Sequence, residues 1–210
     1  MLTVPRTRRS KASAPRDPER TRKRLLSAAS QEVYKSGFQG TDLETILDAA
    51  GVTKGALYYH FENKEALGYA VVDEVLTGIT REKWLEPLRG AADPLAALKG
   101  IFLGTSLRPE HVAGGCPLNN LAQEMSPLDE GFRKRLAKVF ALWHGAIAGA
   151  LRDAQKRGLV RRDVNADETA TFLMAAYEGY ISLSKNSQDA SLLRQGNKAL
   201  AQYLETLRPA

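Results

Sequence analysis

The sequence of 210 residues has few of the residues that commonly build metal centres, disulfides and active sites. Its single cysteine, Cys116, cannot form an internal disulfide, and its three histidines are scattered without the spacing of a zinc site. It also has no glycine-rich phosphate-binding loop and no nucleophile elbow. We therefore expect no metal ligands, no cofactor, no catalytic residues and no enzymatic activity.

Long hydrophobic runs are missing as well. No apolar stretch approaches the length of a membrane span, and no apolar signal-peptide core follows the basic N-terminus. A single cysteine without an export signal predicts a cytoplasmic protein that does not enter a membrane. With 43% hydrophobic residues, the chain is long enough to bury a sizeable core as one or two domains.

The net charge of +6 is concentrated at the N-terminus. Residues 1–24 hold nine Lys or Arg and two acidic residues, which makes this stretch +7 and leaves −1 for the rest. A basic arm can follow DNA phosphates or enter the minor groove, whereas its prolines and small polar residues equally suit a disordered, solubilising tail. A membrane-surface segment would need an apolar face that this one lacks. We assign residues 1–17 to the arm, and the motif that follows favours DNA contact.

A helix-turn-helix is predicted directly after the first long helix. Apolar residues recur at helical spacing over 43–50, with Thr41 as the expected N-cap, and Gly51 ends this helix. Thr53 is expected to cap a second helix only a few residues later. The residues expected to face inward from there are Val52, Leu57 and Phe61. Such a unit places its second helix in the DNA major groove.

The run from Gly51 to Leu67, GVTKGALYYHFENKEAL, resembles the DNA-reading core of the TetR family of transcriptional regulators. The segment from Leu25 to Thr41 is similar to the family's first helix and its closing glycine–aromatic pair. The resemblance implies an all-α fold, with an N-terminal three-helix helix-turn-helix DNA-binding domain followed by a larger helical ligand-binding and dimerisation domain. It also implies DNA contact at the matching positions, which are Thr41, Thr53, Lys54, Gly55, Tyr58, Tyr59, His60 and Lys64.

The chemistry of these residues suits a nucleic-acid surface. Gly55 has no side chain and allows a close approach of the backbone, at a helix-propensity cost of about 1 kcal/mol against alanine. Lys54 offers a cation for a phosphate or for guanine acceptors, and Tyr58 offers a polar tip on an apolar body. Lys64 can reach the flanking DNA backbone.

Each of these assignments has a plainer alternative. Thr41 and Thr53 can be ordinary helix caps. One of Tyr58 and Tyr59 can pack on its own domain, and His60 can be a structural histidine beside an inward-facing aromatic ring. The sequence leaves these alternatives open.

The rest of the chain is predicted to be helical, because no segment shows sustained two-residue alternation. We expect residues 18–66 to form the DNA-binding domain and residues 67–210 the ligand-binding and dimerisation domain. Helices are expected at about 18–36, from 64 onward, at 94–107, at 129–157, after an N-cap at Asn165, and at 189–207, with a loop at 108–117.

The last two expected helices have narrow faces that suit close packing. Their small residues are Ala175, Ala176, Gly179 and Ser182 on the first helix and Gly196 and Ala199 on the second. The large residues expected to fill a seam between two subunits are Leu173, Tyr180, Leu200 and Leu204. The alternative is that these faces bury against their own subunit. The TetR resemblance, which implies a four-helix dimer bundle, favours a homodimer through these two C-terminal helices.

Bulky and adaptable residues in the middle helices predict a partly apolar ligand cavity with a few polar groups. The candidate ligand-binding residues are Phe102, Cys116, Asn120, Met125, Trp143, His144, Met174 and Tyr177. Aromatic residues at helical spacing can equally be core. The resemblance implies an inducer-binding cavity here without fixing the ligand.

Cys116 lies between Gly115 and Pro117, near an expected helix N-terminus, a setting that can lower the pKa of a thiol. The surrounding segment, GGCPLNNLAQEMS, resembles one found in a branch of the family in which some cysteines respond to electrophiles or oxidants. The alternative is an inert buried thiol.

The combined prediction is a DNA-binding transcriptional regulator, a repressor released from a palindromic double-stranded operator by a small-molecule inducer. Two alternatives remain at this point. One is a ligandless DNA-binding dimer, and the other is a thiol-based electrophile or redox sensor acting through Cys116.

Overall fold

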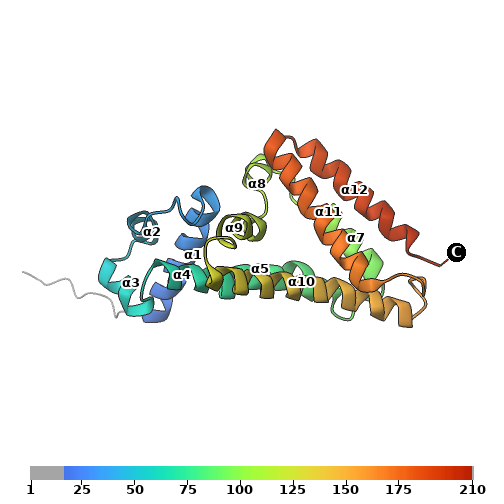
Figure 1. Ribbon diagram of the computed structural model, residues 1–210, viewed down its shortest axis with the longest axis horizontal. Helices are drawn as coiled ribbons and strands as arrows, with labels where there is room; N and C mark the ends of the chain where they lie inside the picture. The colour runs from blue at the N-terminus through green and yellow to red at the C-terminus, as the bar shows by residue number, and fades with distance from the viewer. Residues whose placement is uncertain (1–16, 210) are drawn as a thin grey trace, which may run out of the picture.

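The computed structural model describes residues 17–209, and none of these residues lies in a β-strand. The predicted all-α fold is confirmed (Figure 1). The elements are α1 (Pro18–Ser36), α2 (Leu43–Ala50), α3 (Lys54–His60), α4 (Lys64–Ala70), η1 (Val71–Leu76), α5 (Thr77–Thr80), η2 (Arg81–Leu85), α6 (Glu86–Leu88), α7 (Pro94–Leu103), α8 (Pro109–Gly114), α9 (Pro117–Met125), α10 (Glu130–Lys156), α11 (Ala166–Ser187) and α12 (Ala190–Thr206). The arm expected at 1–17 lies outside the described residues except for Asp17, which caps α1.

The molecule has a small N-terminal lobe and a larger C-terminal lobe. The helices α1 to α4 form the small lobe at the blue end of Figure 1, and α7, α11 and α12 lie together at the other end. The long helix α10 runs along the base of the larger lobe and reaches the small lobe with its first turns, and α8 and α9 lie between the lobes. The small lobe is therefore joined to the large one along much of its inner side.

One uninterrupted helical rod connects the lobes. The segments from α4 to α6 follow each other without a loop from Lys64 to Leu88, and two of them, η1 and η2, are π-helical turns. The rod passes through residues 66 and 67 without a break, so no linker marks the expected domain boundary. The division at that position stays a prediction.

Each lobe has its own hydrophobic core. In the small lobe, Leu25 and Ala29 of α1 pack with Ile46 of α2, Leu57 of α3 and Leu67 of the rod. The larger core joins the rod to α7, α9, α10, α11 and α12. Phe38, in the turn between α1 and α2, belongs to the larger core although it lies in the small lobe by sequence.

Several expected helix ends are confirmed, and one cap is wrong. Thr53, Asn63 and Asn165 each accept a hydrogen bond from a backbone N–H in the first turn of the following helix. Thr41 does not cap α2, because Asp42 occupies that position. The Thr41 side chain is 2% exposed, and its hydroxyl donates to the carbonyls of Glu32 and Gly37 at the end of α1. It satisfies free carbonyls of the preceding helix, as a C-terminus requires.

The expected loop at 108–117 and the expected end of the preceding helix are wrong. Helix α7 ends at Leu103, and six of the residues assigned to the loop form α8. Pro109 fits the first turn of α8, because its missing N–H has no partner there. The connection between α7 and α9 is therefore a helix flanked by short turns.

Part of the expected dimer seam is wrong as well. Leu173, Leu200 and Leu204 are fully or almost fully buried in the core of their own subunit, so they cannot fill a seam with a second one. Gly196 lies under the ring of Tyr180, which a Cβ atom would meet at 2.1 Å. This glycine therefore allows α11 and α12 to pack closely within one chain.

Candidate DNA-reading surface and ligand cavity

Helix α3 presents its polar and aromatic side away from the core. Leu57 is buried beneath it, whereas Tyr58 is 50% and Tyr59 is 74% exposed. Lys54 and Gly55 are exposed too, and a Cβ atom at Gly55 would meet nothing within 4 Å. No packing inside the described chain therefore requires a glycine here, and the site is open to an approaching partner.

The turn before α3 is fixed by a long-range contact. Gly51 has a φ of 59°, a left-handed conformation that glycine adopts easily. The Arg24 guanidinium of α1 donates to the Gly51 carbonyl over 3.1 Å, and a Cβ atom on the glycine would lie 2.6 Å from that nitrogen. Arg24 therefore holds the angle between the two helices of the motif, a role that sequence reasoning missed.

Two of the predicted DNA contacts are engaged inside the protein. The Lys64 ammonium donates to the Phe38 carbonyl over 2.6 Å and lies 4.5 Å from the centre of the Phe38 ring. Thr41 is buried, as described above. His60 is half-buried, with its ring 4.9 Å from that of Tyr59. The freely presented side chains of the set are those of Thr53, Lys54, Tyr58 and Tyr59.

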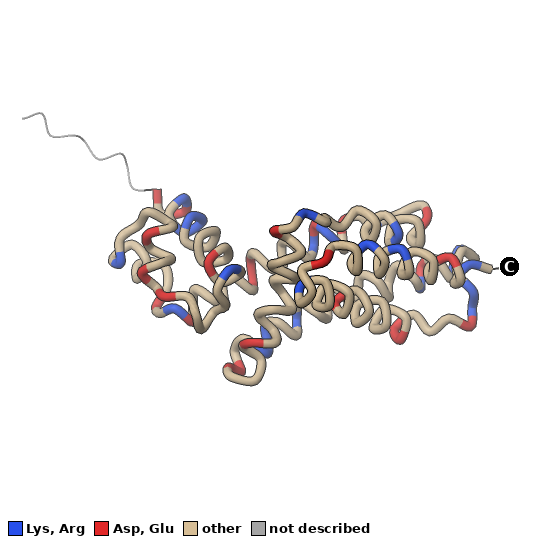
Figure 2. The backbone as a smooth tube through the Cα atoms, turned by 90° about the horizontal axis from the view of Figure 1, so that it is seen from above, with Lys and Arg blue, Asp and Glu red and all other residues tan. Residues whose placement is uncertain are grey.

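Acidic and basic residues are interspersed around the small lobe (Figure 2). Several of the cations already have partners, as in the ion pair between Arg22 and Glu74. Residues 17–70 hold seven Lys or Arg and eight Asp or Glu. Contacts from α3 are therefore better placed than a general positive field to select a DNA sequence.

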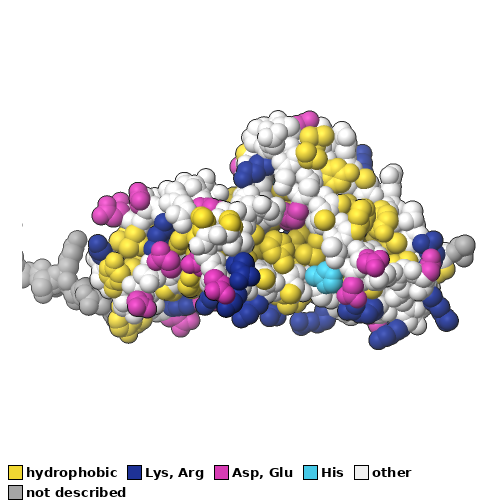
Figure 3. All heavy atoms as spheres, in the orientation of Figure 1, with side chains coloured by type: hydrophobic (Ala, Val, Ile, Leu, Met, Phe, Trp, Pro, Cys, Tyr) yellow, Lys and Arg dark blue, Asp and Glu magenta, His cyan; other side chains and the backbone are white. Residues whose placement is uncertain are grey.

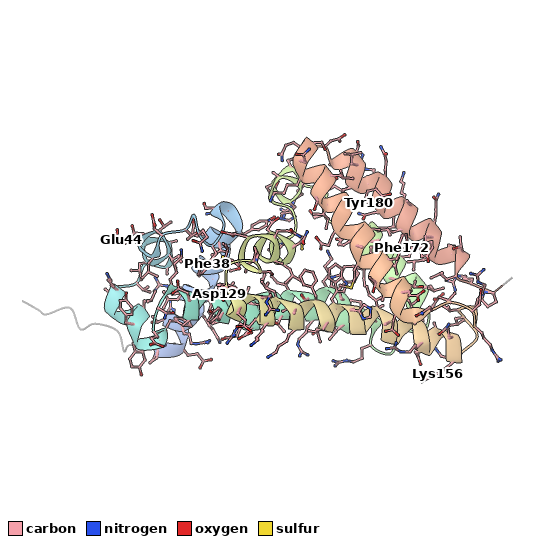
Figure 4. The ribbon with its side chains drawn as sticks, in the orientation of Figure 1. Phe38, Glu44, Asp129, Lys156, Phe172 and Tyr180 are labelled. Atoms are coloured by element: carbon pink, nitrogen blue, oxygen red, sulfur yellow. The ribbon has the colours of Figure 1, made fainter. Side chains whose placement is uncertain are left out.

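The turn at residues 37–39 is held by the larger lobe. The Glu124 carboxylate of α9 accepts hydrogen bonds from the backbone N–H groups of Phe38 over 2.8 Å and Gln39 over 2.7 Å. The Phe38 ring packs edge-on against Phe132 of α10, with 4.7 Å between the ring centres. Phe38 and Asp129 mark this junction in Figure 4. The entry to the helix-turn-helix is thus anchored to α9 and α10.

A cavity of about 510 Å³ lies between the rod, α1, α8, α9, α10 and α11. Its size is within the range of about 300–1,000 Å³ found for small-molecule sites. Trp84 and Trp143 form one side, with 4.7 Å between their ring centres. Tyr177 stands nearly perpendicular to both indoles.

Polar groups interrupt this aromatic wall. The Lys83 ammonium donates to the Tyr177 hydroxyl over 2.6 Å, and the same hydroxyl lies 2.9 Å from that of Thr105. Lys83 also lies over the Tyr177 and Trp84 rings. The cation is thus held by a hydroxyl and two aromatic faces.

Glu178 of α11 carries an acidic group to the same cavity. Burial raises the pKa of its carboxyl, against the lowering effects of hydrogen bonding from the Cys116 thiol and the Asn119 amide and of the nearby Lys83 ammonium. Both carboxylate oxygens are shielded from solvent, and neither accepts a hydrogen bond of normal geometry. The Trp143 indole N–H is buried without a partner in the same way.

Cys116 also lines the cavity and is the N-cap of α9, as expected. Of the two alternatives for this thiol, the structure favours the inert one. Burial raises the pKa of Cys116 from 9.0 to about 12, and the negative charge of Glu178 adds to the effect. Loss of solvent and a neighbouring carboxylate therefore outweigh the helix terminus.

The eight predicted ligand residues do not form one site. Cys116, Trp143 and Tyr177 line the cavity. Trp143, His144 and Met174 border a shallow groove between α10 and α11, and Asn120 lines a cleft between α1 and α9. Phe102 lies behind Trp84 and Tyr177 in the core, and Met125 is also buried core. Asn120 donates to the Gly114 carbonyl and His144 bonds to the Asp167 carbonyl, which are structural roles.

Sequence reasoning missed Lys83, Trp84, Thr105 and Glu178 as cavity residues. A signal was present for Lys83, because it continues the inward stripe of Val72, Leu76 and Thr80 along the rod at helical spacing. A charged residue on such a stripe indicates a polar group directed into the interior.

Helix α1 belongs to both sites. It carries Leu25 and Ala29 into the core beneath α2 and α3, and its Ser30, Gln31 and Tyr34 line the cavity. The Tyr34 hydroxyl donates to the Gly115 carbonyl over 3.0 Å, next to Cys116. One rigid helix thus touches both the reading unit and the space where a ligand would lie.

Residues 17–209 contain no cluster of His, Cys, Asp or Glu that could hold a metal ion. Within the same range, no helix is both long and apolar enough to cross a membrane. The outward-facing helix-turn-helix, joined to a helical lobe with an internal cavity, defines a DNA-binding regulator.

Comparison with known proteins identifies the family. The signature described as "Bacterial regulatory proteins, tetR family" matches residues 25–71, and that of the "Tetracyclin repressor-like, C-terminal domain" matches residues 91–200. The chain belongs to the TetR family, and it is a DNA-binding transcriptional regulator, not an enzyme.

Curated relatives and solved structures agree. The HTH-type transcriptional repressor DhaR of Mycobacterium sp. (strain GP1) is 30% identical over 175 residues, or 83% of this chain and 87% of that protein. The transcriptional regulator AcuR of Cereibacter sphaeroides is 31% identical over 189 residues, or 82% of this chain and 85% of that protein. The crystal structure of a TetR transcriptional regulator from Chloroflexus aurantiacus J-10-FL matches with a TM-score of 0.79 and 31% identity, covering 90% and 96% of the two chains.

Proposed function

We propose that this regulator is a cytoplasmic homodimeric repressor that leaves a palindromic operator when a small, partly apolar molecule enters the cavity. The single observation that carries the proposal is that α1 lines the cavity and also supports α2 and α3. A ligand there would meet a helix of the DNA-reading unit without any intermediary.

The proposed DNA contacts centre on α3. Lys54, Tyr58 and Tyr59 supply the side chains that reach base edges and phosphates, and Gly55 allows the helix to approach closely. Thr53 and His60 contact the flanking backbone. Thr41 and Lys64, whose side chains are engaged inside the protein, act by fixing the turn before α2.

The proposed dimer face is the outward side of α11 and α12. Phe172 is 49% and Leu183 is 57% exposed on α11, with the exposed small residues Ala175 and Gly179 between them. Hydrophobic side chains gather over these two helices in Figure 3, and Phe172 and Tyr180 extend from α11 in Figure 4. A contiguous apolar surface of this kind marks a site of association.

The proposed release depends on α1 and α9. A ligand can shift the protein away from its DNA-binding form only if it binds the other form more tightly. A ligand in the cavity would contact Tyr34 of α1 and Cys116 at the start of α9, while Glu124 at the other end of α9 holds the turn that leads to α2. Displacement of either helix changes how the reading unit is held.

The two alternatives are less well supported. A ligandless dimer does not need an internal cavity with unpaired polar groups. A thiol sensor needs a reactive thiolate, whereas the raised pKa of Cys116 keeps the thiol protonated at neutral pH.

The test begins with the full chain and a pool of random duplexes. We expect the selected sequences to be palindromic and the complex to contain two chains per duplex. A library of small apolar compounds is then screened for loss of binding, with Thr105→Trp as the variant that fills the cavity and Lys138→Trp as a control at an exposed site on α10. Operator binding by a monomer, or a compound that releases both variants equally, would contradict the proposal.

A further inference from the structure

Two buried polar groups on the cavity wall lack partners, and they differ in what they need. The Glu178 carboxylate is an acceptor that receives no hydrogen bond of normal geometry, and the Trp143 indole N–H is a donor without an acceptor. Buried polar groups in proteins are generally paired, and leaving one unpaired is destabilising. Leaving a charged acceptor unpaired costs more free energy than leaving a neutral donor unpaired, so the Glu178 carboxylate is the group that a ligand is expected to pair with.

The nearby cation does not meet that need. Lys83 donates to Tyr177 and lies 4.9 Å from the centre of the Tyr177 ring and 5.4 Å from that of Trp84. It forms no ion pair with Glu178 among the described contacts. The cavity thus holds one cation whose partners are in place and one carboxylate that has only the weak donors Cys116 and Asn119 beside it.

The aromatic surfaces beside Glu178 suit a positively charged group. Trp143 lies 4.7 Å from Trp84 and 6.4 Å from Phe140 between ring centres, so indole and phenyl faces continue from the cavity into the groove between α10 and α11. Glu178 and Trp143 border both spaces. Indole faces attract cations, and an ammonium on a carboxylate makes a charge-assisted hydrogen bond.

We infer that the cavity binds a small organic ammonium, a protonated amine on a compact apolar body. The ammonium donates to Glu178, and the apolar body lies against Trp84 and Trp143. This inference rests on the proposed inducer cavity and names the chemical class of its ligand. An anion directed at Lys83 is the opposite assignment, and the test separates the two.

The sequence provides its own reporter. The only two tryptophans of the chain, Trp84 and Trp143, both line the cavity, so excitation of tryptophan reports its occupancy. Three probes share a phenylethyl body and differ in the head group: 2-phenylethylamine, 2-phenylethanol and 3-phenylpropionate. We expect the amine to bind the full chain at least tenfold more tightly than either of the others.

Variants then identify the group that is responsible. Glu178→Gln keeps the size of the side chain and removes its charge, and we expect it to lower the affinity for the amine to that for the alcohol. Glu168→Gln is the matched control, an exposed glutamate on the same helix, and is expected to change nothing. Lys83→Met removes the neighbouring positive charge and is expected to strengthen amine binding, which provides a second test if Glu178→Gln does not fold.

The inference is overturned if the alcohol or the propionate binds as tightly as the amine, or if none of the three binds. It is also overturned if a folded Glu178→Gln chain keeps the preference for the amine, or if Lys83→Met weakens amine binding. Operator binding is measured separately on the same preparations. A chain that binds operator but not the amine disproves the ligand class alone, whereas a chain that binds no DNA disproves the proposed function.

Discussion

Tyr58 and Tyr59 of α3 are half or more exposed, whereas Tyr177 of α11 is buried against two indoles with both sides of its hydroxyl in use. The same residue type thus serves opposite purposes in the two lobes. In the small lobe, its polar tip is left free for a partner outside the chain. In the large lobe, it holds a cation and a threonine in place and shapes a cavity. The exposure of the tyrosine side chain, rather than the residue type, distinguishes the DNA-reading surface from the ligand cavity.

The largest expected effect concerns the burial of the Cys116 thiol on the cavity wall. Because the pKa of Cys116 is raised to about 12 from 9.0, its thiolate fraction at pH 8 should be about 1,000-fold lower than in the unfolded chain. Iodoacetamide labelling followed by mass spectrometry should show this difference between native protein and protein in urea. The rate should rise about tenfold per pH unit up to the raised pKa. Equal labelling of the two states would mean that the cavity is open and would revive the thiol-sensor alternative.

The second prediction tests the open character of α3. The double substitution Tyr58→Ala with Lys54→Ala should weaken operator binding at least about 30-fold, because each subunit of a dimer loses roughly 1–3 kcal/mol of contact. Both side chains are exposed, so the thermal melting temperature should hardly change. Gel shift and circular dichroism measure the two effects. As a control, Glu44→Ala and Asp48→Ala on the exposed side of α2 should not weaken binding. Unaltered operator affinity in the double variant would remove α3 as the reading element.

The third prediction concerns the contact between the lobes. Glu124→Ala removes the acceptor for two backbone N–H groups, and each hydrogen bond to a charged group contributes about 1.5–3 kcal/mol. The half-buried site reduces this, so we expect a loss of about 2 kcal/mol in the free energy of unfolding, measured in urea. Exchange of the Phe38 and Gln39 amides with deuterium should accelerate as well. Gln123→Ala, its exposed neighbour on α9, serves as the control. Slow exchange in the Glu124 variant would show that the turn does not depend on α9.

The smallest expected effect is that of Tyr34→Phe. It removes only the hydroxyl that donates to Gly115, a neutral hydrogen bond that contributes about 0.5–1.5 kcal/mol. The operator affinity of the variant in the absence of ligand should stay within about threefold of that of the unsubstituted protein. The concentration of compound needed to release the operator should change more than the affinity itself, since α1 would be less firmly joined to the start of α9. Equal changes in both quantities would indicate a general loss of stability rather than a loss of communication.

The local signals in the sequence were sufficient for much of the fold. Asp17, Pro18 and Gly37 define α1 to the residue, because caps, first-turn prolines and left-handed glycines act within a few residues. Thr41 failed because Asp42 is an equally good cap, and tertiary contacts decided between them. The short helix α8 was missed because six residues hold too little periodicity to outweigh a proline and two glycines.

The cavity could be predicted only in part, for a different physical reason. Cys116, Trp143 and Tyr177 were predicted as bulky or polar groups in apolar helices. Which residues they face across the cavity depends on distances between helices, which the spacing of residues in the sequence does not contain. Phe102 and Met125 have the same character and lie in ordinary core. Leu173, Leu200 and Leu204 show the same limit on the C-terminal helices, where apolar periodicity could not distinguish the inward face from the outward one. The residues proposed to contact DNA and ligand therefore stay predictions.

The turn at residues 37–39 has a consequence for genetics. Three helices hold it, through Glu124 on α9, Phe132 on α10 and Lys64 on α4. Gly37 itself has no room for a side chain, since a Cβ atom would lie 2.9 Å from the Glu124 carboxylate. Random mutagenesis with selection for cells that express the reporter constitutively should therefore return alleles at this corner, away from both the reading helix and the cavity. The mutated residues would form a single cluster in the structure, where the lobes meet.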